Sequence, residues 1–216
     1  MIQEKREVPL VVVKRLPRYY RYLGELLRKG ITRISSGELS KRMGVTASQI
    51  RQDFNCFGGF GQQGYGYNVE KLHREIANIL GLSHGYKTII IGAGHLGHAL
   101  ANHTNFAKRG FELVGIFDKK PELAGKVIND LPVLPMEELE EFCNTHQVNI
   151  AILALPKSAI IEVVPRLVAL GIKGLWNFSY TDIAVPEDVA VENVHLSDSL
   201  MTLSYKITEK QKQGDA

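Results

Sequence analysis

Apolar side chains recur at helical spacing in the first part of the chain. Pro17 suits a first helical turn, and Gly30 suits the residue after a last one. The side chains that repeat every three or four residues between them are Tyr19, Tyr22, Leu23, Leu26 and Leu27. This repeat predicts an amphipathic helix that ends near Gly30.

Two capping patterns follow this helix. Ser35 with Glu38, and Thr46 with Gln49, both have the spacing of a capping box, in which a side chain at each end bonds the other's backbone N–H. The first box opens a short helix, and the second opens a helix that runs to about Phe54. A glycine turn separates the two helices, so the segment predicts a helix-turn-helix.

A glycine-rich segment comes next. Residues 57–67 hold five glycines among aromatic side chains, which suits a β-hairpin wing whose backbone can approach a groove closely. Asn68 then caps a connecting helix that runs to about Leu80, and residues 81–85 are expected to form a linker.

The second part of the chain opens on a dinucleotide-binding fingerprint. Residues 88–91 have the pattern of a buried strand and run into a turn formed by Gly92, Ala93, Gly94, His95, Leu96 and Gly97. Gly92 would make the tight turn, Gly94 would admit a pyrophosphate, and Gly97 would let helix and strand pack closely.

An acidic residue follows at the distance that this fingerprint requires. Asp118 ends the second predicted strand, 21 residues after Gly97, where a carboxylate would bind the ribose 2′-hydroxyl. Because it would repel a 2′-phosphate, NAD(H) is expected rather than NADP(H), although Lys119 beside it weakens the inference.

Strands and helices alternate through the rest of the chain. Strands are expected at 148–155, 174–178 and 189–194, with helices at 135–145 and 158–170. This alternation predicts an α/β fold with a Rossmann-like, doubly wound parallel sheet. The strand-end residues expected to border the nicotinamide, or to be ordinary loop residues, are Ala154, Leu155, Pro156, Asn177 and Phe178.

The basic charge of the chain is concentrated in the part that precedes the fingerprint. Residues 1–83 carry 14 lysines and arginines against 7 acids, whereas the remainder has a net charge of −4. A basic first module suits nucleic-acid binding, although a solvated basic face is an equal alternative on charge alone. The two cysteines suggest no metal site, and the lack of a signal or membrane pattern favours the cytoplasm.

The helix-turn-helix suggests which side chains would meet DNA. The start of its second helix would lie in the major groove, so Ser48, Gln49, Arg51 and Gln52 are candidates to face base edges. Those nearer the phosphates would be Arg15, Arg18, Lys41 and Arg42, and the remaining candidates are Thr46, Gly59, Gln62 and Gln63. Two packed helices without DNA are the alternative to this interpretation.

The chain has little room for catalysis. Only 119 residues follow Gly97, and the predicted sheet uses them, so no substrate domain is expected and the protein is predicted not to be an enzyme. A ligand sensor is the better interpretation. A small NAD-dependent oxidoreductase, or a CoA- or nucleotide-binding protein whose first domain dimerises, is the runner-up.

The last segment predicts a helix with an uncovered apolar stripe. Residues 196–207 place apolar side chains at helical spacing behind a cap at Ser197 or Asp198. The stripe would pack on its own domain or on a second subunit, because a DNA-binding protein of this size usually dimerises.

Together these motifs resemble the Rex family of redox-sensing repressors. The resemblance rests on residues 16–23, 50–54, 64–69 and 171–178 together with the fingerprint. It implies a homodimer that exchanges its C-terminal helix, binds a palindromic operator with NAD or without cofactor, and releases it when NADH rises. The expected domains are a winged helix (1–83), a Rossmann domain (84–195), the swapped helix (196–209) and a tail (210–216).

The resemblance also implies a coupling contact between the two domains. An arginine at the position of Arg21 would pair with an aspartate near the start of the swapped helix. His195 stands at that aspartate position, with Asp198 nearby as a substitute. Two basic DNA-contacting positions of the family are taken by Gln52 and Gln63.

Overall fold

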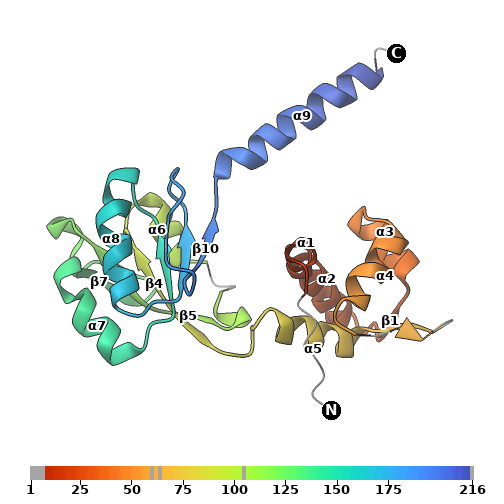
Figure 1. Ribbon diagram of the computed structural model, residues 1–216, viewed down its shortest axis with the longest axis horizontal. Helices are drawn as coiled ribbons and strands as arrows, with labels where there is room; N and C mark the ends of the chain where they lie inside the picture. Colours follow the sequence, from red (N-terminus) through yellow and green to blue (C-terminus); the bar gives the residue numbers. More distant parts are fainter. Residues whose placement is uncertain (1–7, 59–60, 63–64, 104–105, 215–216) are drawn as a thin grey trace. The chain divides into compact units, whose positions relative to one another are not determined.

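The chain folds into two compact units, and the division between them falls between His84 and Gly85. Figure 1 presents the computed structural model, which describes residues 8–58, 61–62, 65–103 and 106–214. The boundary lies within the segment 81–85 that the sequence marks as a linker.

The first unit is a winged helix, as the sequence predicts. Its helices are α1 (Leu10–Val13), α2 (Leu16–Arg28), α3 (Ser36–Met43), α4 (Ala47–Asn55) and α5 (Val69–Ile79). Its antiparallel sheet has the order β1 (Arg33–Ile34), β3 (Gly66–Asn68), β2 (Gly61–Gln62). The hydrophobic pattern does not predict the short helix α1.

The capping predictions are confirmed at one helix and half right at the other. At α3, Ser35 Oγ accepts from the backbone N–H of Glu38 (3.1 Å), and the Glu38 carboxylate accepts from that of Ser35 (2.8 Å). At α4, Thr46 Oγ1 accepts from the Gln49 N–H, but the Gln49 side chain does not return to Thr46. It donates instead to the carboxylate of Asp53 (2.9 Å), a charged acceptor one turn away on the same helix.

Among the described residues of the winged helix, Asp53 is the charged side chain that is buried, with 1% of its surface exposed. Arg15 donates to both of its oxygens, at 2.7 and 2.6 Å, and Tyr19 Oη donates at 2.8 Å. Burial alone would raise the pKa of Asp53, but the hydrogen bonds from Arg15, Gln49 and Tyr19 outweigh it and hold the pKa below its usual value. The network therefore fastens α4 to the start of α2 around an ionised carboxylate.

The second unit is a seven-stranded sheet of the order β10-β9-β8-β4-β5-β7-β6. Its strands are β4 (Tyr86–Ile91), β5 (Phe111–Asp118), β6 (Val127–Ile128), β7 (Leu131–Pro135), β8 (Ile150–Leu153), β9 (Gly174–Asn177) and β10 (Ala190–Asn193). All pairings are parallel except that of β6 with β7. The doubly wound sheet is thus confirmed, with an unforeseen antiparallel edge.

Helices cover both faces of this sheet. Strand β4 alternates, with Ile89 and Ile91 in the core beneath α7 (Leu139–His146) and α8 (Lys157–Ala169), and Ile90 in the core beneath α6 (His95–Ala101). The sequence predicted a helix from residue 135, but Pro135 ends β7 and a 3₁₀ turn at Met136–Glu138 precedes α7. Pro135 has no backbone N–H to donate to a further ladder bond, so the strand ends there.

The C-terminal helix α9 (Leu196–Gly214) follows β10 (Figure 1). It continues past residue 209, so most of the expected tail is helical. The large apolar side chains of α9 are exposed, and these are Leu196, Leu200, Met201, Leu203, Tyr205 and Ile207. In the part of the chain that the structure describes, no helix is long and apolar enough to cross a membrane.

Asp53→Asn should destabilise the first unit by about 2–3 kcal/mol, because it leaves the Arg15 guanidinium without its anion. The pKa of Asp53 is lower in the folded than in the unfolded chain, so its contribution is present above about pH 4 and is lost as the pH falls through the folded value. Urea unfolding of both proteins at several pH values measures this, and the variant should lose less stability on the acid side than the parent protein.

The matched control is Asp188→Asn, which breaks an exposed ion pair with Lys173 in the second unit. It should leave the unfolding curves unchanged. Equal stability of Asp53→Asn and the parent protein would show that the buried network does not hold α4.

Candidate functional site

The fingerprint turn lies at the end of β4 and leads into α6. Gly92 has φ = 103°, and a Cβ there would lie 2.4 Å from the carbonyl oxygen of Ala154. A Cβ on Gly97 would lie 1.8 Å from the carbonyl oxygen of Gly92. A Cβ on Gly94 would meet no atom within 4 Å. Two glycines therefore allow close packing, and Gly94 faces open space at the N-cap of α6.

This turn stands where the chain order of the sheet reverses. Strand β4 lies between β5 and β8, so the loops after these strands leave in opposite directions. The N–H of Gly92 donates to Phe117 O (2.7 Å) and that of Ala154 to Ile91 O (2.9 Å). The structure thus brings Ala154 and the neighbouring Leu155 against the fingerprint, with the exposed Pro156 next along the chain.

Asp118 ties the second strand to the fingerprint. Its Oδ2 accepts from the backbone N–H of Ala93 (2.7 Å), and its Oδ1 accepts from that of Lys120 (2.9 Å). Each carboxylate oxygen has a second lone pair for a further donor. The side chains of His95 and Lys119 are exposed beside this edge, and Leu96 is half-buried.

Asn177 ends β9, at the strand end where the sequence predicts it, but its side chain points into the protein. It is fully buried, and its amide donates to Thr181 O (2.7 Å) and Asn193 Oδ1 (2.8 Å). Its Oδ1 accepts from the N–H and the Oγ of Ser179. Because all four bonds of the amide are used, Asn177 shapes the loop after β9 and cannot offer its side chain to a cofactor. The close spacing of Asn177, Ser179 and Thr181 was the missed signal.

Phe178 is half-buried and packs edge-on against Trp176, with ring centroids 4.6 Å apart. Both rings pack against the core cluster beneath α6. Phe178 therefore lies at the carboxyl end of β9, on the same face of the sheet as α6.

The exposed surface of α4 carries most of the predicted DNA contacts. Thr46, Ser48, Arg51 and Gln52 are exposed, and Arg51 Nη1 donates to Ser36 Oγ on α3 (3.1 Å). Gln49 is half-buried, and its side-chain amide donates to Asp53. This donor is therefore used within α4 and is not free to contact a base.

The predicted phosphate contacts divide in the same way. Arg18, Lys41 and Arg42 are exposed. Arg15 donates two hydrogen bonds to the carboxylate of Asp53, so its side chain positions α4. In the wing, Gln62 belongs to β2, and Arg33 donates to the carbonyl oxygen of Tyr65 (3.3 Å). Gly59 and Gln63 lie outside the described residues.

The coupling residues belong to different units. Arg21 is an exposed residue of α2, whereas His195 and Asp198 flank the start of α9. His195 Nδ1 lies 3.8 Å from Asp198 Oδ2, so within the second unit these two side chains pair with each other when the histidine is protonated. A contact of Arg21 with either of them stays a prediction.

Comparison with known proteins gives a consistent result. Residues 7–55 match the family model described as "Putative DNA-binding protein N-terminus", and residues 83–181 match "CoA binding domain". The redox-sensing transcriptional repressor Rex of Thermoanaerobacter pseudethanolicus is 56% identical over 210 residues, covering 97% of this chain and 94% of the relative. Rex of Clostridium tetani is 50% identical over 98% of this chain and 100% of its own.

Solved structures agree along the whole chain. A crystal structure of RSP in complex with β-NAD⁺ and operator DNA has a TM-score of 0.88 and 55% identity, covering 97% of this chain and 96% of that one. A structure of RSP with β-NADH has a TM-score of 0.88 and 52% identity, over 96% and 98% of the two chains. The chain therefore belongs to the Rex family of redox-sensing transcriptional repressors, which are not enzymes.

Proposed function

We propose that this protein represses transcription by binding operator DNA, and that NADH releases it. The proposal rests on one observation: a single chain joins a winged helix to a dinucleotide fold, and its whole length matches a repressor solved with β-NAD⁺ and operator DNA. The DNA-bound form carries NAD or no cofactor, and NADH favours a form with weaker affinity for DNA.

The nucleotide would lie across the carboxyl edge of the sheet. Its pyrophosphate would approach Gly94 at the N-cap of α6, where a Cβ would meet no protein atom within 4 Å and the first N–H groups of the helix have no partner within it. Asp118 would accept from the adenosine ribose, and Ala154 to Pro156 would border the nicotinamide half. Phe178 would border it at the next strand, whereas Asn177 acts by shaping that loop.

Operator DNA would meet α4 and the wing. Ser48, Arg51 and Gln52 are the exposed candidates for base edges, and Arg18 and Lys41 those for phosphates. Arg15 and Gln49 would act through Asp53, by holding α4 at its angle.

The functional form would be a homodimer in the cytoplasm, where operator DNA is. The exposed apolar side chains of α9 support an exchange of this helix between two subunits. A dimer would present two copies of α4 to half-sites about 34 Å apart, or a multiple of that spacing. NADH would close the dimer and move the winged helices out of register with the operator.

The direct test is the affinity for a palindromic operator with saturating NAD⁺ and with saturating NADH, measured by fluorescence anisotropy. We expect binding to be roughly 10- to 100-fold weaker with NADH, and the operator should weaken NADH binding by the same factor. Equal affinity in the two states would refute redox sensing, and no operator binding in either would refute repression.

Two alanine substitutions in the fingerprint should separate binding from folding. Gly94→Ala adds a Cβ that touches no protein atom, so the melting temperature should be unchanged. NADH binding should weaken by at least about tenfold, because the added Cβ keeps the pyrophosphate from approaching the backbone. Gly97→Ala forces α6 off the Gly92 carbonyl and should lower both the melting temperature and NADH affinity. If Gly94→Ala bound NADH as tightly as the parent protein, the cofactor could not bind at this turn.

Asp118→Ala should weaken NADH binding and reduce the preference for NADH over NADPH. The variant loses an acceptor for the 2′-hydroxyl and the charge that repels a 2′-phosphate. Calorimetric titration with both nucleotides measures the ratio. Glu122→Gln removes an exposed charge a few residues away and should keep the parent ratio; an unchanged ratio in Asp118→Ala as well would exclude Asp118 from the site.

A further inference from the structure

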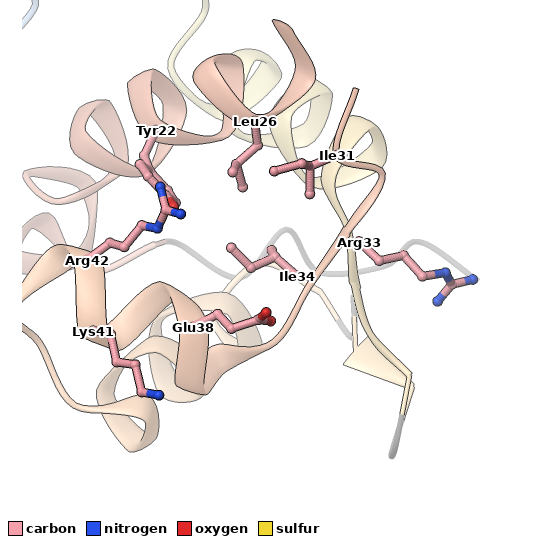
Figure 2. Close-up of a pocket in the computed structure, with 8 residues that line it drawn as sticks. All are labelled: Tyr22, Leu26, Ile31, Arg33, Ile34, Glu38, Lys41 and Arg42. Carbon is pink, nitrogen blue, oxygen red and sulfur yellow. The ribbon is translucent and has the colours of Figure 1, made fainter. Parts of the chain in front are cut away.

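The winged helix contains a cavity whose apolar wall neither the DNA surface nor the cofactor fold explains, although Lys41 and Arg42 of its lining are also expected near phosphates. It has a volume of about 270 Å³ and lies between α2, β1 and α3 (Figure 2). A water molecule occupies about 30 Å³ in the liquid, so the space equals roughly nine waters, or an organic molecule of about ten non-hydrogen atoms.

One wall of the cavity is apolar. Leu26 on α2 and Ile34 on β1 are buried core residues that face it, and Ile31 stands at its mouth with 37% of its surface exposed (Figure 2). A fully hydrated ion has no apolar part to place against these side chains, so the wall suits a molecule with a hydrocarbon body.

The other end of the cavity offers hydrogen-bond donors. Tyr22 Oη is buried, and no described residue gives it a hydrogen-bond partner. The guanidinium of Arg42 lies over the Tyr22 ring, 5.5 Å from its centroid, and Figure 2 shows the two groups together at this end. A hydroxyl beside a planar guanidinium is a donor set that matches a carboxylate.

Charge along the lining also favours an anion. The lining contains Arg33, Lys41 and Arg42 against one acid, Glu38. The Glu38 carboxylate already accepts from the backbone N–H and the Oγ of Ser35 at the start of α3. Arg33 extends toward Tyr65 in the wing, which leaves Arg42, at the Tyr22 ring, as the cation placed to meet a ligand at that end (Figure 2).

We propose that this cavity binds a small amphipathic carboxylate, with its hydrocarbon part on Leu26, Ile31 and Ile34 and its carboxylate on Arg42 and Tyr22. The site is a second input to the protein, separate from the nucleotide fold. This next step rests on the proposed function: binding of the carboxylate weakens operator binding. The bound anion neutralises positive charge on α3, where Lys41 and Arg42 are expected near phosphates.

The test uses the full chain, labelled with ¹³C in the methyl groups of isoleucine and leucine and titrated with octanoate, 1-octanol and inorganic phosphate. Octanoate should shift the methyl signals of Leu26, Ile31 and Ile34 and saturate at about a millimolar or below. It should leave Ile89 in the second unit unchanged. 1-Octanol should bind several-fold more weakly, and phosphate should not compete.

Two variants and one control locate the carboxylate. Tyr22→Phe keeps the ring and should weaken octanoate several-fold without lowering the melting temperature, since the hydroxyl it removes is unpartnered among the described residues. Arg42→Gln should bring octanoate down to the affinity of 1-octanol. Arg74→Gln, an exposed arginine on α5, should bind octanoate like the parent protein.

Three results would overturn the proposal: no shift of the three methyl signals at about 10 mM octanoate, equal binding of octanoate and 1-octanol, or displacement of octanoate by phosphate. The last would identify a contact for a DNA phosphate. Operator affinity is measured separately with and without octanoate. Octanoate should weaken operator binding several-fold and reduce the dependence of that affinity on salt concentration. Because the methyl titration needs no DNA, it decides the site even if operator binding fails.

Discussion

The winged helix depends on one buried carboxylate. Asp53 lies on the helix expected to enter the major groove, yet its side chain points inward, where Arg15, Tyr19 and Gln49 surround it with donors. A charge in this position is tolerated only while every partner stays in place, because each missing donor exposes the desolvation penalty of the carboxylate. The angle of α4 is therefore set by a polar network as well as by the apolar packing of Phe54.

The second unit relies on close backbone contact instead of charge. Gly92 and Gly97 let β4, α6 and the loop after β8 approach to distances that any side chain would prevent. Asp118 then bonds the backbone of Ala93, so the residue expected to recognise ribose also holds the turn that faces the pyrophosphate. On the proposed function, recognition of the nucleotide and local folding would use the same atoms.

Local signals in the sequence were sufficient for most of the fold. The capping box at Ser35, the cap at Asn68 and the fingerprint are each complete within a few residues, and the structure confirms them. What the sequence could not supply were contacts between distant residues. Arg15 and Asp53 are 38 positions apart in the sequence, and the periodicity of a helix or strand cannot predict such a pair. For the same reason the sequence pattern assigns Arg15 and Gln49 to DNA, whereas in the structure both bind Asp53.

The same distinction changes how the basic charge of the first unit is understood. The 14 lysines and arginines of residues 1–83 overstate the number of cations that are free to meet phosphates. Arg15 is neutralised by Asp53, and Arg33 is directed toward the backbone of Tyr65. The remaining charge still attracts DNA at long range, because the field depends on the total. Contacts that release counterions depend instead on exposed cations such as Arg18, Lys41 and Arg51, so the salt dependence of operator binding should reflect that smaller set.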